Sequence, residues 1–208
     1  KELIMMSYIY EIETRFHFST EKEIYQKLPF LKSYLELEVK WKTDHYGEKL
    51  FKKDYVLRIS QSNVKGAKIV SLGYKEPDFG QKINIRKEYS EKIADIIQNS
   101  EILQILKGKK SLKNKILLAK ELERLGYEKF MSFNGYSLLG KYDPLNLKLK
   151  IMHCRDLQFP LLLEIEKEAE MKEEIKDKEE SILNFIEEYD LKDKLIKKEP
   201  PTLLYEKI

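Results

Sequence analysis

A period-two alternation of apolar and charged residues is the feature that most constrains this chain. In the first such segment, 8–18, Glu11, Glu13 and Arg15 share one side of an extended strand, and apolar or aromatic residues share the other. The same alternation recurs at 55–60, 68–75, 83–89, 147–152 and 161–166, and 39–44 is a further candidate. The pattern predicts β-strands that each have one apolar face and one face that carries charge.

The acids and bases on these charged faces are arranged differently. Glu11 lies next to Glu13 on one face, and Glu164 lies next to Glu166. The basic residues are single and come from separate strands: Arg15, Arg58, Lys75 and Arg86. Neighbouring carboxylates repel each other unless a cation lies between them.

Two structures explain this pattern. An open antiparallel sheet with one face in water would show the same alternation. A closed sheet would instead turn the charged faces inward around a cavity. Hard divalent cations prefer oxygen ligands and often share a site with phosphates, which Arg and Lys bind well. The paired carboxylates favour this second structure, with a polyanion site inside.

Helical patterns separate the strands. Segment 19–28 has a capping box at Thr20 and Glu23 and ends before Pro29. Amphipathic helices are expected at 90–107, at 111–125 and, with a strongly charged face, at 168–189, and the tail after Pro200 and Pro201 is expected to be extended. These elements predict one α+β domain, residues 1–208, in which an antiparallel sheet or barrel packs against helices.

Composition excludes several classes of protein. The net charge is +3, which argues neither for nor against nucleic acid. The single cysteine, Cys154, permits no intrachain disulfide and is typical of a cytoplasmic protein. No apolar run approaches the ~18 residues that cross a membrane, and KELIMMSYIY is too short for a signal peptide. A cytoplasmic protein without a membrane partner is therefore expected.

The motifs resemble those of the CYTH superfamily of triphosphate-tunnel enzymes, above all the class IV adenylyl cyclases and the thiamine triphosphatases. EIETR (11–15) resembles the family's E-x-E-x-K motif, with arginine in place of lysine. VLRIS, LGYKEP, IRKEY and LLLEIE resemble its later strands, and they supply Arg58, Lys75, Arg86 with Glu88, and Glu164 with Glu166. EPPTLLYEKI resembles the class IV cyclase ending.

The chain departs from the family pattern after the turn LGY at 125–127. A K-x-R pair is expected there, and its positions fall near Gly135 and Ser137. Lys148 and Lys150 have a suitable parity to replace it, and an ordinary solvent-facing role explains them equally well. Asp156 is the candidate for the aspartate that precedes the closing glutamates in the family.

The resemblance implies a closed or nearly closed antiparallel β-barrel with helices packed outside. It also implies chemistry on a nucleoside triphosphate, tripolyphosphate or another small triphosphate with Mg²⁺ or Mn²⁺, either by cyclisation or by hydrolysis. The expected metal ligands are Glu11, Glu13, Asp156, Glu164 and Glu166. The expected substrate ligands are Arg15, Arg58, Lys75, Arg86, Lys148 and Lys150, and the expected catalytic residues are Glu88, Arg15 and Arg58.

Two alternatives stay open at this point. Loss of the K-x-R pair would suit a domain that binds nucleotide or polyphosphate without turnover. Recognition of an RNA 5′-triphosphate is a third hypothesis, to which the near-neutral charge gives no support. The resemblance also allows a homodimer.

Overall fold

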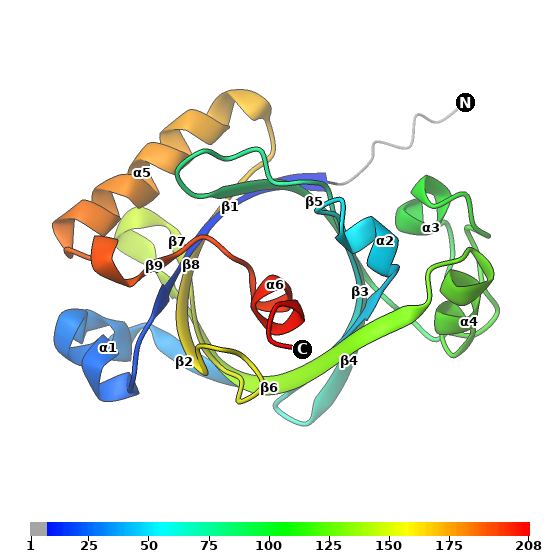
Figure 1. The fold of residues 1–208 in the computed structure, drawn as a ribbon, viewed down its shortest axis with the longest axis horizontal. Coiled ribbons are helices and arrows are strands. Elements are labelled where there is room, and N and C mark those ends of the chain that lie inside the picture. Colours follow the sequence, from blue (N-terminus) through cyan, green and yellow to red (C-terminus); the bar gives the residue numbers. More distant parts are fainter. Residues whose placement is uncertain (1–7) are drawn as a thin grey trace.

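A closed antiparallel barrel is the centre of the computed structural model, which describes residues 8–208 (Figure 1). Its strands are β1 (Tyr8–His17), β2 (Leu35–Tyr46), β3 (Val56–Val64), β4 (Ala67–Lys75), β5 (Asn84–Lys92), β6 (Lys129–Tyr142), β7 (Leu147–His153) and β8 (Leu161–Ala169). They follow the order β5-β4-β3-β2-β6-β7-β8-β1, and β1 pairs with β5 to close the ring. The short strand β9 (Leu195–Ile196) adds to β1.

Pairing on both sides of β1 fixes which side chains enter the barrel. On one side Glu11 lies opposite Arg86 of β5, and on the other Glu13 lies opposite Glu166 of β8. Because side chains alternate along a strand, this register turns the charged faces inward and the apolar faces outward. The predicted α+β fold with a closed barrel is confirmed.

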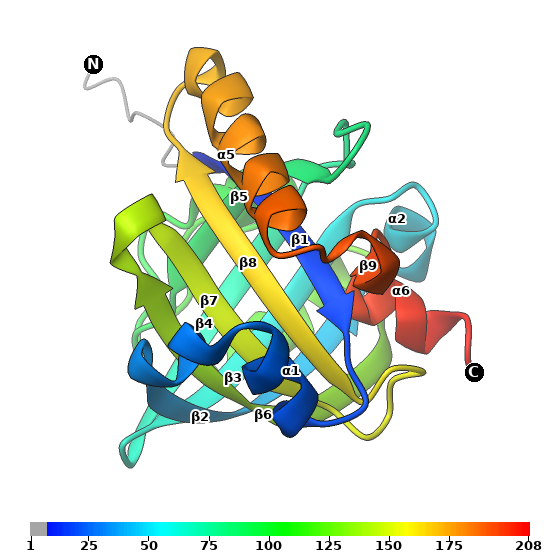
Figure 2. The ribbon, with the colours of Figure 1, turned by 90° about the vertical axis from the view of Figure 1, so that its left-hand side faces the viewer.

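The hydrophobic core therefore lies outside the barrel, in two clusters. The first packs the outer faces of β1, β7 and β8 against α1 (Glu21–Lys27) and α5 (Ile175–Glu188), and Figure 2 shows α5 in front of β1 and alongside β8. The second packs the outer faces of β3 to β5 against α3 (Glu101–Ile105) and α4 (Leu117–Arg124), with α2 (Glu48–Phe51) beside them. Short 3₁₀ turns lie at Pro29–Ser33, Asp143–Leu145, Lys172–Glu174 and Lys192–Lys194.

A third apolar cluster lies inside one end of the barrel. Viewed down the barrel, α6 (Pro200–Tyr205) lies within the ring of strands (Figure 1). Leu203 and Leu204 of α6 are buried there with Phe133 and Leu162, which point inward from β6 and β8. This helix closes part of the bore and leaves the remainder to the charged side chains.

The start of α1 follows its predicted capping box. Thr20 Oγ1 accepts a hydrogen bond from the Glu23 backbone N–H at 3.2 Å, and the Glu23 carboxylate accepts one from the Ser19 N–H at 2.9 Å. Gly126 also has the left-handed φ of +86° that suits a residue after a helix end.

Three helix predictions need correction. Strand β5 continues to Lys92 and β8 to Ala169, because each pairs with a neighbour beyond the expected end. The helices that follow these strands are accordingly shorter, with α3 beginning at Glu101 and α5 at Ile175. The helix α4 begins at Leu117, after Leu112 has paired with Ile97 in an isolated β-bridge.

The tail is helical where an extended form was expected. Pro200 and Pro201 occupy the first turn of α6, where a missing N–H and a fixed φ are both tolerated.

Strand β2 is longer than 39–44, and β6 was not among the predicted strands. The alternation of apolar and polar residues in β6 is interrupted by the small residues Gly135, Ser137 and Gly140, so this pattern does not predict the strand. Among residues 8–208 no helix is long and apolar enough to cross a membrane.

Candidate active site

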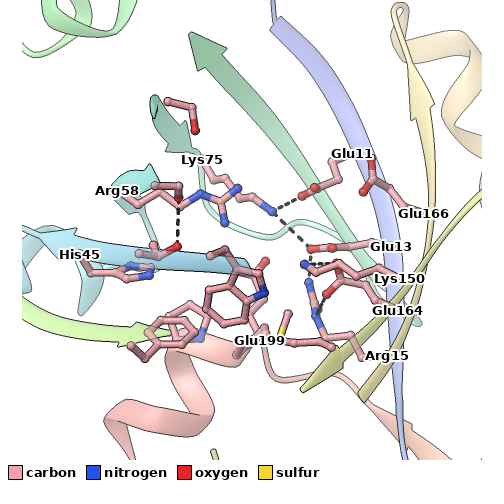
Figure 3. Close-up of a pocket in the computed structure, with 18 of the residues that line it drawn as sticks. Glu11, Glu13, Arg15, His45, Arg58, Lys75, Lys150, Glu164, Glu166 and Glu199 are labelled. Carbon is pink, nitrogen blue, oxygen red and sulfur yellow. Dashed lines mark hydrogen bonds and ion pairs between the residues drawn. The ribbon is translucent and has the colours of Figure 1, made fainter. Parts of the chain in front are cut away.

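The inward faces of the strands surround a cavity of about 300 Å³ (Figure 3). Charged side chains from β1, β3, β4, β7 and β8 line it, and Glu199 joins them from the segment before α6. The charged lining consists of Glu11, Glu13, Arg15, Arg58, Lys75, Lys150, Glu164, Glu166 and Glu199. Side chains that lie up to 188 positions apart in the sequence thus share one cavity.

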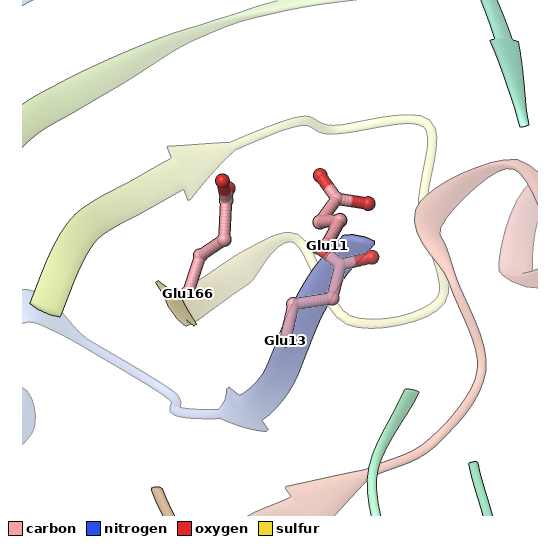
Figure 4. Close-up of side chains that lie close together, drawn as sticks. All are labelled: Glu11, Glu13 and Glu166. Atoms are coloured by element: carbon pink, nitrogen blue, oxygen red, sulfur yellow. The ribbon is translucent and has the colours of Figure 1, made fainter. Parts of the chain in front are cut away.

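Three of the carboxylates form a group that could hold a divalent cation. Glu11 and Glu13 come from β1 and Glu166 from β8, and one oxygen of each lies within 4.8 Å of the others (Figure 4). Carboxylate oxygens are the ligands that Mg²⁺ and Mn²⁺ prefer. The donor set therefore fits such an ion.

Mutual repulsion shows in the titration of this group. Burial raises the pKa of Glu166 to about 7, and the charges of Glu13 and Glu164 add to the effect against the attraction of Lys148. Burial, Glu13 and Glu88 hold the pKa of Glu11 well above its ordinary value. Glu13 behaves differently, because Arg15 and Lys75 lower its pKa although burial acts to raise it. The protein alone thus compensates Glu11 and Glu166 poorly, and a divalent cation would favour their ionised forms.

Lys75 and Arg15 supply the buried positive charge beside this group. The Lys75 ammonium contacts Glu11 and lies 3.5 Å from Glu13 Oε1. Arg15 contacts Glu13, and its Nε donates to Glu164 Oε2 at 2.9 Å. Although burial acts to lower the pKa of Lys75, its carboxylate partners raise it well above the ordinary value, so the side chain stays charged.

Arg58 and Lys150 approach the cavity from β3 and β7. Arg58 Nη2 donates to Glu88 Oε1 at 3.0 Å, and Lys150 Nζ donates to Glu164 Oε1 at 3.0 Å. Gly73 of β4 makes room for Arg58, because a Cβ at that glycine would lie 3.1 Å from Arg58 Nε. Glu88 is itself buried behind the cavity and orients Arg58.

Besides Glu88, three candidate residues lie apart from the cavity lining. Arg86 is held by protein groups: Nη1 donates to the Asp54 carbonyl at 2.7 Å, and Nε lies 2.7 Å from Glu199 Oε1. Lys148 is half exposed and lies 3.1 Å from Glu166 Oε1 at the rim. Asp156 lines a second pocket, beyond the end of β7, and is not in the three-carboxylate group.

The positions expected for the K-x-R pair carry no charge. Ser137 is buried and accepts a hydrogen bond from Trp41 Nε1 at 2.8 Å. At Gly135 a Cβ would lie 2.1 Å from the His153 carbonyl and 2.8 Å from the Trp41 ring, so this backbone admits no larger residue without moving. These two positions of β6 are therefore neutral.

Sequence reasoning missed several residues of the lining. Trp41, Thr43 and His45 share the inward face of β2. The period-two alternation that assigns faces in the other strands also assigns these three residues to one face. No sequence signal points to Glu199, because α6 carries it to the bore through a tertiary contact.

Comparison with known proteins gives a consistent result for the fold. No protein-family model and no curated protein matches this sequence. Among solved structures, PH1819 from Pyrococcus horikoshii OT3 matches with a TM-score of 0.69 and 19% identity over 95% of this chain and 99% of its own. A proposed adenylate cyclase from Vibrio parahaemolyticus matches with a TM-score of 0.63 and 13% identity over 94% and 98%.

The third structure is HpAC1 from Hippeastrum, a proposed adenylyl cyclase with a dominant triphosphatase activity. It matches with a TM-score of 0.59 and 15% identity over 96% of both chains. At these identities the likeness concerns the fold, and it extends along nearly the whole of each chain. The chain shares with these proteins a closed barrel fold, which is the fold that the resemblance of its motifs to the CYTH superfamily implies.

Proposed function

We propose that the bore binds a triphosphate together with Mg²⁺ or Mn²⁺ and acts on it as a metal-dependent enzyme. The observation that carries the proposal is the meeting of three adjacent carboxylates with Arg15, Arg58, Lys75 and Lys150 around one cavity. Positioning and charge neutralisation dominate phosphoryl transfer, and this cavity offers groups of both signs for that purpose.

The charge balance of the cavity makes the metal essential to binding. Five carboxylates and four basic side chains line it, so the lining carries no excess of positive charge for a polyanion. Glu11, Glu13 and Glu166 would hold the divalent ion. When bound, that ion would neutralise phosphate oxygens and lower the pKa of a coordinated water.

The basic side chains would change partners when substrate enters. In the ligand-free protein Lys75 and Arg15 neutralise Glu11, Glu13 and Glu164. A phosphate chain takes over as the partner of these cations while the carboxylates turn to the metal. Glu88 keeps Arg58 directed at the cavity, which suits a guanidinium that binds phosphate oxygens through two parallel hydrogen bonds.

This arrangement supports hydrolysis of the terminal phosphate and cyclisation of a nucleotide with release of pyrophosphate. HpAC1 is a proposed adenylyl cyclase with a dominant triphosphatase activity, and the Vibrio parahaemolyticus protein is a proposed adenylate cyclase. The two reactions differ in the phosphorus that is attacked, so the identity of the product separates them.

A second candidate function is binding without turnover. The neutral residues Gly135 and Ser137 stand where the family resemblance predicts a basic pair. Contacts that act mainly in the transition state can be lost while binding is kept. A sensor of nucleotide or polyphosphate would therefore bind saturably and leave its ligand intact.

The test is a panel of ATP, tripolyphosphate and a triphosphorylated RNA, each with Mg²⁺ or Mn²⁺ and with identification of the products. Release of phosphate or of cyclic nucleotide is expected, and Glu11→Gln and Glu164→Gln should each abolish it. Glu36→Gln, on the exposed outer side of β2, is the matched control and should retain full activity. Metal-dependent binding without any product would favour the sensor, and failure of every ligand to bind would overturn both functions.

A further inference from the structure

A lobe of two short helices stands outside the barrel wall and carries a run of lysines. The lysine lobe, residues 95–124, includes α3 and α4, and Figure 1 shows it across the barrel from α5. Between residues 102 and 120 the chain has no acidic residue. The same stretch contains six lysines: Lys107, Lys109, Lys110, Lys113, Lys115 and Lys120. Their charge exceeds that of the whole chain, +3, so the rest of the molecule is net negative.

The positive charge of these lysines is largely uncompensated. All six side chains are exposed. Lys115 Nζ lies 2.7 Å from Asp95 Oδ1, and within residues 8–208 the other five lysines form no ion pair. A surface of one sign attracts an oppositely charged surface over about one Debye length, roughly 8 Å at physiological salt.

The backbone that carries the lysines is held by the rest of the lobe. Glu121 of α4 is buried and accepts a hydrogen bond from the Lys109 N–H at 2.9 Å. Arg124 donates to the same carboxylate at 2.7 Å and 2.8 Å. The Ser100 N–H donates to the Lys110 carbonyl at 2.8 Å. The lysines therefore project from a surface of defined shape.

Aliphatic side chains are exposed beside the lysines. Ile116 is 72% exposed, Ile96 58% and Leu117 40%. The Lys115 N–H donates to the Asp95 carbonyl at 2.8 Å, which brings the segment of Ile96 beside that of Ile116. A partner that covers these side chains would gain the free energy of burying apolar surface.

The composition of the lobe favours an anionic lipid surface over nucleic acid. Residues 95–124 contain no aromatic residue, and the one arginine, Arg124, is bound to Glu121. Nucleic acids are read largely through arginine forks and stacking on aromatic rings. Lysines attract anionic lipid headgroups, and isoleucine and leucine enter the boundary between headgroups and acyl chains.

The charge on the other side of the barrel would orient the molecule on such a surface. The helix α5 has five acidic and two basic residues and lies across the barrel from the lobe. An anionic membrane would repel α5 and attract the lobe. The lobe lies beside the ring of strands and not within it, unlike α6 (Figure 1).

We propose that the lysine lobe docks the protein on the surface of a membrane that contains anionic lipids. The six lysines face the headgroups, and Ile96, Ile116 and Leu117 enter the interface. The sequence alone predicted no membrane partner because it lacks a long apolar run, but contact with a membrane surface requires no spanning segment. The inference does not depend on the proposed triphosphate chemistry.

The experiment measures co-sedimentation of the full chain with vesicles. Vesicles of equal parts phosphatidylcholine and phosphatidylserine are compared with vesicles of phosphatidylcholine alone. The protein should bind the anionic vesicles at least about tenfold more tightly, because several lysines contribute together. Added salt should weaken this binding, since it screens the attraction between exposed charges.

A triple variant tests the lysines directly. Lys109→Gln, Lys110→Gln and Lys113→Gln together should weaken binding to anionic vesicles by about tenfold or more. The matched control combines Lys22→Gln, Lys172→Gln and Lys176→Gln, which remove the same charge from exposed lysines on and beside α1 and α5. This control should bind like the wild type. Ile116→Ser should weaken binding several-fold.

Three results would overturn the proposal. The first is equal binding of the wild type to neutral and anionic vesicles, and the second is equal loss in the two triple variants. The third is an Ile116→Ser variant with wild-type affinity, because the exposed aliphatic side chains favour lipid over nucleic acid. A single-stranded RNA that binds more tightly than anionic vesicles, with the same loss in the lobe variant, would replace the membrane by nucleic acid as the partner.

Discussion

Single residues set the electrostatics of the bore. Glu11, Glu13 and Glu166 lie close together, and burial with the repulsion of neighbouring carboxylates raises the pKa values of Glu11 and Glu166. Lys75 and Arg15 compensate part of this charge in the ligand-free protein. Two predictions follow from that incomplete compensation.

The first concerns the pH dependence of metal binding. Because the pKa of Glu166 lies at about 7, the proton must leave before this carboxylate can bind Mn²⁺. Mn²⁺ affinity should rise about tenfold between pH 6 and pH 8 and level off above that range. Calorimetric titration at several pH values measures it.

Glu166→Gln should weaken Mn²⁺ binding and remove most of this pH dependence. The matched control is Glu170→Gln, at an exposed residue just after β8 and outside the three-carboxylate group, which should behave like the wild type. A pH-independent affinity in the wild-type protein would contradict the assignment of Glu166 as a ligand.

The second prediction concerns Lys75→Met. Removing one partner of a buried ion pair typically costs about 3–5 kcal/mol, because the remaining charge is left buried and uncompensated. Unfolding by urea should show a loss of about 3 kcal/mol, and added Mg²⁺ should restore part of it by replacing the ammonium. Lys68→Met, at the exposed end of the same strand, should change stability by less than about 0.5 kcal/mol.

At the scale of elements, α6 is the least expected part of the molecule. It enters the barrel mouth, where Leu203 and Leu204 pack on inward-facing residues of β6 and β8. Pro200 and Pro201 line the cavity, and Glu199 lies beside Arg86. The helix thus forms one wall of the site. Glu199, just before the helix, holds Arg86 away from the cavity.

Truncation of a buried α6 side chain should loosen that wall. Leu204→Ala should lower the free energy of unfolding by about 2–4 kcal/mol, the usual range for a buried leucine, because Leu204 is 6% exposed. Ile208→Ala, at a residue that is 80% exposed just after the helix, should have almost no effect. Equal effects of the two substitutions in a urea titration would contradict the packing of α6.

At the scale of the whole molecule, the barrel is built with its apolar core outside and its ionisable groups inside. The free energy of unfolding should therefore depend on pH through buried groups whose pKa values are shifted in opposite directions. The folded-state pKa of Glu166 is raised from 4.5 to about 7, whereas that of His45 is lowered from 6.5 to about 3. Each linkage has a definite sign.

The stability that Glu166 contributes is fully present below about pH 4.5 and is lost as pH rises towards 7, because the folded state holds the proton more tightly. His45 acts in the opposite direction, since its contribution is lost as pH falls from about 6.5 towards 3. Relative to the metal-free wild-type protein, the Glu166→Gln variant should gain about 1–2 kcal/mol in the free energy of unfolding as pH rises from 5 to 7.5, because only the wild type loses the contribution of Glu166. A constant difference in unfolding free energy over that range would contradict the raised pKa.

Much of the site could be predicted from local pattern alone. Alternation determined that Glu11, Glu13 and Arg15 would share one face of β1, because a strand turns its side chains to opposite faces with a period of two. It likewise placed Arg58 and Lys75 opposite the apolar faces of their own strands. The α+β class followed from the same pattern. These features depend only on residues near one another in the chain.

Tertiary structure alone decided which of these groups meet and which do not. Pairing of β1 with β8 places Glu166 beside Glu13, while Asp54 and Glu199 hold Arg86, and the Pro200–Tyr205 segment becomes a helix inside the barrel mouth. Partners distant in sequence set each of these outcomes, and local propensity carries no record of them. The sequence determined the faces of the strands, and pairing between distant segments determined the site.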